Sequence, residues 1–155
     1  MTTTAKPKHI PRGEGKTYQL GRLTLTVKTS GADNAAAYTL CEAFEPPGWS
    51  AALHRHPTYD ETHIICEGHY ECQLGAQLLG LGPGDMMFVP RGAPHSIKNV
   101  GLETGRELII SSPGGIFDAF IDEAATALSN DNVSKLGPGT DFRAIAAKYG
   151  IEFLS

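Results

Sequence analysis

The chain has 155 residues, 41% of them hydrophobic and 19% charged, with a formal net charge of −4 at pH 7. These values are typical of one globular domain with a substantial core. No cluster of Lys or Arg indicates a nucleic-acid interface, no apolar run approaches the ~20 residues that span a bilayer, and no secretory signal begins the chain. We therefore expect no nucleic-acid partner and no membrane partner. Three cysteines, an odd number without a CxxC pair, favour a reducing, cytoplasmic setting.

The sequence predicts a flexible arm followed by a long region of strands. Residues 1–15 mix Pro, Gly, Lys and Arg, and we expect them to form a flexible N-terminal arm. Residues 16–112 consist of short strand-like runs, such as 36–45, 61–68 and 106–112, separated by Gly, Pro and Asn. This spacing indicates an all-β sandwich or barrel rather than alternating strands and helices.

The pattern changes after Ser112. Apolar residues of the segment 114–128 recur at helical spacing, and residues 139–150 form a second helical pattern. We expect residues 113–155 to form C-terminal helices that pack against the outside of the β core, with a loop at 129–139. The whole chain, 1–155, is expected to be a single domain.

Several metal-binding residue types lie on the predicted strands. His54 and His56 are two residues apart, so both can reach one point from the same face of a strand. Glu61, on the adjacent strand after a turn, can reach that point too, and His95 is the best candidate for a fourth ligand. Each histidine alone is more simply explained as a hydrogen-bonded strand residue, but four such residues together favour a site for one divalent transition metal ion. The sequence does not choose among Fe, Mn, Ni, Co, Cu and Zn.

Two motifs at these residues resemble the cupin superfamily. Residues 48–68 match its first motif, G-x5-H-x-H-x4-E-x6-G, and residues 84–99 match its second, G-x5-P-x-G-x2-H-x3-N. The fixed positions are Gly48, His54, His56, Glu61 and Gly68, then Gly84, Pro90, Gly92, His95 and Asn99. The resemblance implies a double-stranded β-helix, the jelly-roll barrel of the cupins, at 16–112. It also implies that His54, His56, Glu61 and His95 are the metal ligands.

A further resemblance concerns the C-terminal region. The segments "SSPGGIFDAFIDEA" and "FRAIAAKYGIEFL" are similar to the ends of single-domain quercetinase-like cupins. This resemblance implies a metal-dependent dioxygenase that acts on a phenolic or enolic small molecule, with Glu61 as both ligand and base. Cupins of this kind commonly dimerise through sheet edges, so we expect a homodimer.

His63 has no place in the four-ligand pattern. It follows Glu61 by two residues and shares its strand face, so we predict a catalytic role in which it orients a ligand or binds substrate. A histidine placed higher in the barrel, in contact with water, is the alternative.

The predicted substrate pocket combines His63 with apolar and aromatic walls. Its predicted walls are Trp49, Tyr59, Met86 and Phe88, with Phe44 and Met87 as further candidates. Strand alternation lets only Met86 and Phe88, or only Met87 and Val89, face the barrel interior.

Two other functions use the same residues. The first is a metal-assisted isomerase, lyase or polyketide cyclase that needs no dioxygen. The second is a cupin that binds a small molecule without catalysis.

Overall fold

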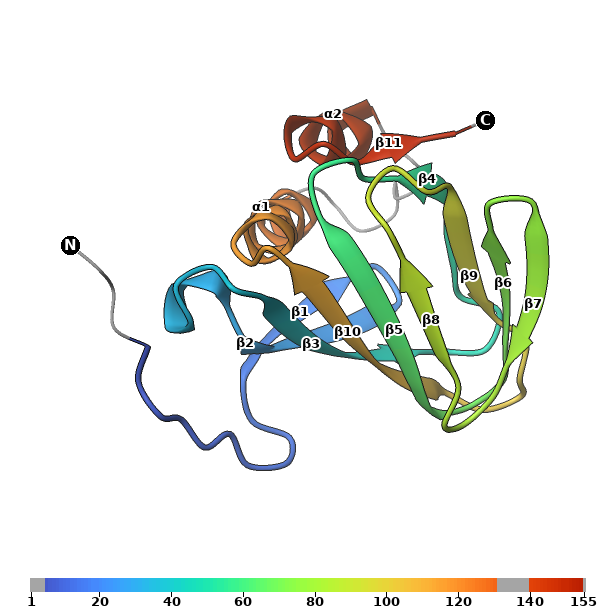
Figure 1. Ribbon diagram of the computed structural model, residues 1–155, viewed down its shortest axis with the longest axis horizontal. Helices are drawn as coiled ribbons and strands as arrows, with labels where there is room; N and C mark the ends of the chain where they lie inside the picture. Colours follow the sequence, from blue (N-terminus) through green and yellow to red (C-terminus); the bar gives the residue numbers. More distant parts are fainter. Residues whose placement is uncertain (1–4, 131–139, 155) are drawn as a thin grey trace.

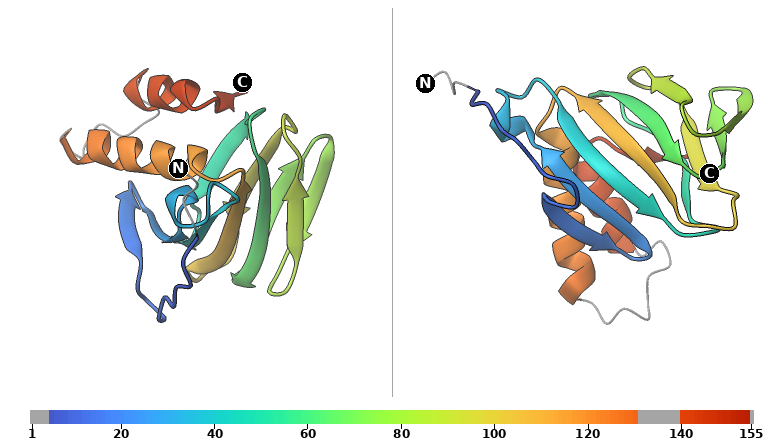
Figure 2. Two further views of the ribbon diagram at one scale, coloured as in Figure 1. Left: turned by 60° about the vertical axis from the view of Figure 1, so that its left-hand side comes forward. Right: turned by 90° about the horizontal axis from the view of Figure 1, so that it is seen from below.

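The structure is a computed structural model that describes residues 5–130 and 140–154. Two antiparallel sheets face each other, and two helices lie at one side of the sheet pair (Figures 1 and 2). In spatial order, the six-stranded sheet contains β1 (Lys16–Leu20), β2 (Leu23–Thr29), β3 (Thr39–Glu45), β10 (Gly105–Ser112), β5 (Asp60–Glu67) and β8 (Met86–Val89). The five-stranded sheet contains β11 (Glu152–Phe153), β4 (Ser50–Arg55), β9 (His95–Asn99), β6 (Tyr70–Leu74) and β7 (Gln77–Leu81). The prediction of an all-β fold is confirmed.

Strict alternation of buried residues defines the inner face of the six-stranded sheet. In β3 and β10, every second residue is buried, and the residues between are partly exposed. Because successive side chains of a strand point to opposite faces, the buried set of each strand lies on one face. Besides Cys41, Ala43 and Ile109, this inner set contains the polar residues Thr39, Glu45, Glu107 and Ser111.

The two helices, α1 (Ile116–Asn130) and α2 (Thr140–Lys148), cover part of that inner face. Phe120 and Ile121 of α1 belong to one buried cluster with Leu25, Cys41 and Ile109 of the sheet. The helices therefore cover one part of the inner face, and the second sheet covers another part. The expectation that the helices pack against the outside of the β core is wrong, because they pack against Cys41 and Ile109, which belong to the inner face of the sheet. Residues 131–139, most of the predicted loop, lie outside the described residues.

The C-terminal segment also contains a strand that the sequence did not predict. In β11, Glu152 lies opposite Arg55 of β4 and Phe153 lies opposite His54. Arg55 Nε is 2.6 Å from Glu152 Oε2, and the amide of Leu154 donates a hydrogen bond to the Leu53 carbonyl at 2.9 Å. This segment therefore extends the sheet that carries the candidate ligand His54.

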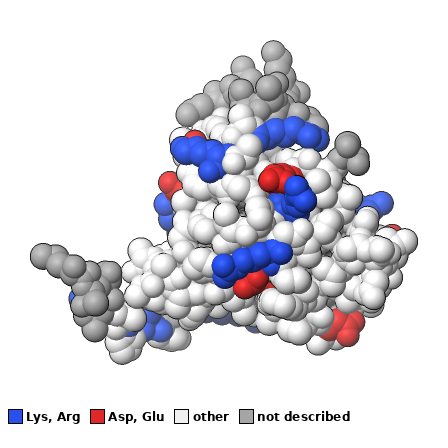
Figure 3. Space-filling model, turned by 45° about the horizontal axis from the view of Figure 1, so that its top comes forward, with Lys and Arg blue, Asp and Glu red and all other residues white. Residues whose placement is uncertain are grey.

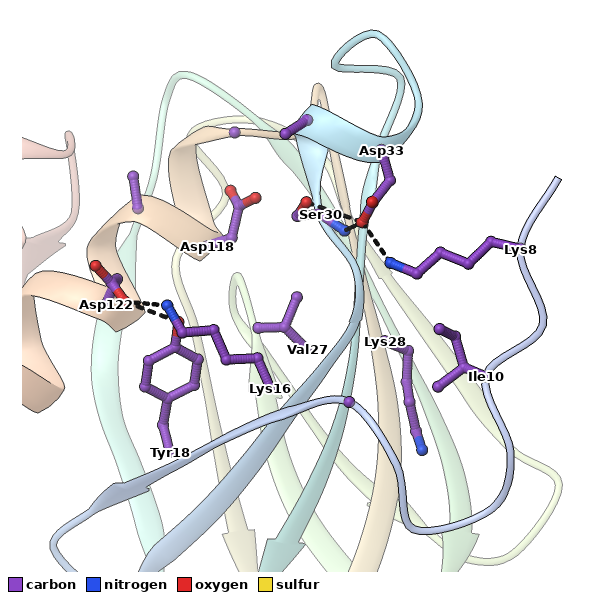
Figure 4. Close-up of a pocket in the computed structure, with 14 residues that line it drawn as sticks. Lys8, Ile10, Lys16, Tyr18, Val27, Lys28, Ser30, Asp33, Asp118 and Asp122 are labelled. Atoms are coloured by element: carbon purple, nitrogen blue, oxygen red, sulfur yellow. Dashed lines mark hydrogen bonds and ion pairs between the residues drawn. The ribbon is translucent and has the colours of Figure 1, made fainter. Parts of the chain in front are cut away.

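Ion pairs connect the N-terminal region to the rest of the molecule (Figure 4). Lys8 Nζ lies 2.9 Å from Asp33 Oδ2, beside the 3-10 helix η1 (Gly31–Asp33), and Lys16 Nζ lies 2.7 Å from Asp122 of α1. A cavity of about 640 Å³ separates these pairs. The flexibility of residues 1–15 stays a prediction.

The molecular surface mixes both signs of charge. On the face shown in Figure 3, basic and acidic side chains are interspersed and most of the surface is uncharged. Within the described residues, no helix has the length and apolar character needed to cross a membrane.

Candidate metal centre

Four predicted ligands converge between the two sheets. One donor atom from each of His54, His56, Glu61 and His95 lies within 4.8 Å of the other three. Nε2 of His56 is 3.1 Å from Glu61 Oε2 and 3.2 Å from His95 Nε2. His56, Glu61 and His95 are buried, whereas His54 is partly exposed. Glu61 comes from β5, in the sheet facing β4 and β9, so the expectation that it arrives on a strand adjacent to the histidines is wrong.

A β-bulge in β4 turns the histidines inward. Ala51 pairs with Ile97 and His54 pairs with His95, which leaves one extra residue in β4 between these two pairs. An extra residue shifts the alternation of a strand, and such bulges re-aim side chains beside functional sites. Ala51 can therefore pack in the core while His54, at an odd spacing from it, also faces the interior.

Backbone carbonyls set the tautomer of all three imidazoles. Nδ1 of His54, His56 and His95 lies 2.7, 3.0 and 3.0 Å from the carbonyl oxygens of Ala52, Tyr59 and Ala93, respectively. A carbonyl oxygen only accepts, so each Nδ1 carries the proton and each Nε2 presents a lone pair. The unprotonated Nε2 atoms of His56 and His95 then face each other at 3.2 Å, an arrangement that a cation between them would stabilise. The donor set therefore fits a divalent transition metal.

The protein groups also favour the protonation states that metal binding needs. Burial, followed by the nearby charge of His95, lowers the pKa of His54 to about 4. Burial alone would raise the pKa of Glu61. The charge of His63 and the hydrogen bond that His63 donates outweigh burial and hold that pKa well below its usual value. At neutral pH Glu61 is a carboxylate and His54 a neutral imidazole.

His63 lies directly behind the metal centre. It is 4% exposed, with Nε2 at 3.1 Å from Glu61 Oε2 and Nδ1 at 2.9 Å from Glu107 Oε2. Burial would lower the pKa of His63, but the charges of Glu107 and then Glu61 raise it well above its usual value. The prediction that His63 faces the interior is confirmed, and the alternative of a histidine in contact with water is wrong. Its catalytic role stays a prediction.

Tyr59 forms part of the wall of the site. Its ring stacks on His56 with centroids 4.0 Å apart. The ring centroid of Phe117 of α1 lies 6.1 Å from that of Tyr59. Trp49 is partly buried and packs against both apolar clusters of the core. Whether Tyr59 and Trp49 contact a substrate stays a prediction.

The predicted pocket residues of β8 lie on the wrong face. Glu61 pairs with Val89 and His63 with Met87, so Met87 and Val89 share their inward side and are buried. Met86 and Phe88 point outward and are 59% and 51% exposed, so their prediction as pocket walls is wrong. All four residues are apolar, so the strand contains no polar residue that would have distinguished the two faces.

Four buried polar residues near the site were missed. Glu45 and Glu107 lie on the inner faces of β3 and β10, and Tyr70 Oη donates to Glu45 Oε2 at 2.6 Å. Ser111 lies opposite Glu61 in the β5–β10 register, and its buried hydroxyl has no partner among the described residues. The two-residue period of β3 and β10 could have predicted the buried glutamates, because Glu45 and Glu107 lie on the same strand faces as the buried apolar residues.

Residues 43–111 match the model of the cupin domain family. The matched region, 69 of the 155 residues, contains all four converging ligands. Two curated proteins are similar in sequence. An uncharacterised protein of Methanocaldococcus jannaschii, MJ1618, is 35% identical over 75 residues, which are 48% of this chain and 60% of that protein. Quercetin 2,3-dioxygenase of Bacillus subtilis is 28% identical over 105 residues, which are 68% of this chain and 30% of that protein.

Solved structures share the fold. An RmlC-like cupin from Shewanella frigidimarina aligns with a TM-score of 0.60 and 18% identity, over 72% of this chain and 96% of its own. The polyketide cyclase RemF from Streptomyces resistomycificus aligns with a TM-score of 0.60 and 24% identity, over 69% of this chain and 80% of its own. At these identities the likeness concerns the fold, and it confirms the double-stranded β-helix.

Proposed function

We propose that this protein is a metal-dependent dioxygenase that acts on a phenolic or enolic small molecule. The observation that carries the proposal is the convergence of three correctly tautomerised imidazoles and one carboxylate inside a cupin barrel. The choice of reaction is supported by the sequence similarity to quercetin 2,3-dioxygenase, although this chain covers only 30% of that protein's length.

The metal ion would be held by the four converging residues and, when bound, would act as a Lewis acid on a substrate oxygen. Glu61 is a deprotonated carboxylate beside that position, so it would accept the proton of a substrate hydroxyl. His63 contacts Oε2 of Glu61 and would hold this carboxylate in one orientation. The ring of Tyr59 would form the wall of the site beside His56 and help to exclude water.

Elemental analysis of the purified protein, followed by oxygen-uptake measurements with flavonols, catechols and diketones, tests the proposal. We expect about one transition metal ion per chain and oxygen consumption with at least one substrate class. Turnover that proceeds equally well without dioxygen would instead support an isomerase, lyase or cyclase. Metal and ligand binding without any turnover would support a binding module.

A matched pair of histidine variants tests the site itself. His54→Ala should lose most of the bound metal, because it removes one of four ligands. His69→Ala removes an exposed histidine of the β5–β6 turn and should keep the metal content of the parent protein. Equal metal content in the two variants would refute the site.

The reducing, cytoplasmic setting is also part of the proposal. Cys41, Cys66 and Cys72 are free thiols in the structure, and Cys41 and Cys72 are buried. Burial, then the nearby charge of Glu107, raises the pKa of Cys72 to about 12, so this thiol is unreactive at neutral pH.

A further inference from the structure

A second group of titratable residues lies behind His63, on the side away from the metal centre. Glu107 of β10, Glu45 of β3 and Tyr70 of β6 are each no more than 1% exposed. Tyr70 belongs to an apolar cluster with Ile65 and other buried residues, and the buried Asn99 lies opposite it in the β6–β9 register. None of these three groups contacts the four metal-binding side chains directly in the structure.

Two hydrogen bonds and one strand register bring these residues together. His63 Nδ1 lies 2.9 Å from Glu107 Oε2, and Tyr70 Oη donates to Glu45 Oε2 at 2.6 Å. Gly105 lies opposite Glu45 in the β3–β10 register, so Glu45 and Glu107 are diagonal neighbours on the inner face. The other carboxyl oxygen of Glu45, Oε1, is buried and has no donor partner in the part of the chain that the structure describes.

Two adjacent buried carboxylates cannot both be ionised without a large cost, because each loses its hydration and repels the other. A single proton on Glu45 removes one negative charge and gives the pair a donor. Burial first, and then the charge of Glu107 and a hydrogen bond with its carboxyl, raise the pKa of Glu45 to about 9. The other titratable groups facing Glu45 are the neutral Tyr70 phenol and His63, and the latter opposes this shift only in part.

We propose that Glu45 is a carboxylic acid that shares its proton with Glu107, and that Glu107 is a positioning residue that holds His63 against Glu61 of the metal centre. Glu107 accepts from His63 Nδ1, so the opposite ring nitrogen of His63 is directed at the ligand carboxylate. Because Glu45 carries the proton, Glu107 is the only negatively charged member of the pair. The proposal rests on the proposed metal centre but not on which reaction that centre performs.

Infrared spectroscopy of the purified protein tests the shared proton. At pH 7, we expect the carbonyl stretch of a protonated carboxylic acid, and we expect Glu45→Gln to remove it. Glu71→Gln changes an exposed glutamate of β6 and should leave the band in place. Absence of the band from the parent protein, or its persistence in Glu45→Gln, would overturn the shared proton. This readout requires neither metal nor turnover, so it stays informative even if the dioxygenase proposal fails.

Zinc(II) competition against a chromophoric chelator tests the positioning role. Glu107→Gln keeps a hydrogen-bonding side chain but loses the anion, and we expect zinc(II) affinity to fall about 10- to 100-fold, as when an outer partner of a metal ligand is lost. Glu45→Gln keeps a neutral partner for Glu107 and should retain affinity near that of the parent. Equal affinity in Glu107→Gln and the parent protein would refute the positioning role.

A third variant tests the assignment of the acid while both carboxyl groups remain. Tyr70→Phe removes only the hydroxyl that donates to Glu45. We expect this variant to shift the protonated-acid band without abolishing it, because the environment of Glu45 changes while Glu107 remains. A band identical to that of the parent protein would show that the acid is not Glu45.

Discussion

The imidazole of His56 stacks on the ring of Tyr59, with centroids 4.0 Å apart and ring planes within 7° of parallel. The same tyrosine holds Nδ1 of His56 through its backbone carbonyl, at 3.0 Å. One residue therefore fixes both the plane and the tautomer of a metal-binding imidazole. The turn between β4 and β5, which places Tyr59 three residues after His56, is thus part of the metal centre.

Removal of the Tyr59 ring is expected to weaken metal binding. In Tyr59→Leu the backbone carbonyl remains but the stacking surface is lost, so zinc(II) affinity should fall by about 10-fold or more, as for other supports of metal ligands. Tyr59→Phe keeps the ring and should bind zinc(II) like the parent protein. Chelator competition measures both. If the phenylalanine variant is as weak as the leucine variant, the hydroxyl rather than the stacked ring is the support.

The space at Gly105 is predicted to be essential for the Tyr70–Glu45 hydrogen bond. A Cβ at Gly105 would collide with the Tyr70 hydroxyl, so Gly105→Ala should destabilise the protein by about 1–3 kcal/mol, the usual cost of overpacking. Gly80→Ala, in β7, meets open space and has no positive φ, and should leave the free energy of unfolding almost unchanged. Urea unfolding of the two variants checks this difference, and equal stabilities would contradict it.

Glu45 should make stability depend on pH. Its pKa is about 9 in the folded protein and near 4.5 in the unfolded chain, so the folded state binds more protons between these values. Its contribution to stability is therefore fully present below about pH 4.5 and decreases as the pH rises towards 9. Urea unfolding from pH 5 to pH 9 should show a smaller loss of stability in Glu45→Gln than in the parent protein, whereas Glu71→Gln should follow the parent curve.

The C-terminal strand should support the histidine side of the site. Phe153 lies opposite His54, its ring is 6.0 Å from the imidazole, and Arg143 lies over it at 5.1 Å. Phe153→Ala should lower both zinc(II) affinity and stability, the latter by less than the about 3–5 kcal/mol typical of a fully buried phenylalanine. Leu102→Ala, at a highly exposed loop position, is the control and should change neither quantity.

The predicted homodimer can be tested at the two edges that carry exposed apolar residues. Phe88 lies on the edge strand β8 of the larger sheet and Leu78 on the edge strand β7 of the smaller sheet. If an edge mediates dimerisation, a lysine placed there should yield monomers, because a desolvated charge opposes association. Light scattering of Phe88→Lys and Leu78→Lys distinguishes the edges, and a monomeric parent protein would refute the prediction.

The metal ligands could be predicted because their spacing along the chain is itself the signal. His54, His56, Glu61 and His95 occupy motif positions with Gly and Pro at defined offsets, and the turn chemistry of those residues depends only on local sequence. The inward direction of His63 followed from the two-residue period relative to Glu61. These inferences needed no knowledge of which strands are neighbours.

Contacts between distant strands could not be predicted in the same way. Glu45 and Glu107 are 62 positions apart, from residue 45 to residue 107, and only the β3–β10 register places them together. The inner face of β8 was ambiguous because all four of its residues are apolar. The position of the helices was mispredicted because an amphipathic pattern shows that one face is buried, but not which side of a sheet buries it.

The partners that orient the three metal-binding imidazoles are main-chain carbonyls, at Ala52, Tyr59 and Ala93. A main-chain oxygen persists through every substitution, so a point mutation at these positions keeps the accepting atom. The alignment of the donor atoms therefore depends little on which side chains stand at these positions, and the side chains around the barrel interior are free to diverge. Such a centre can acquire new substrates by changing its walls while its ligand geometry is inherited intact.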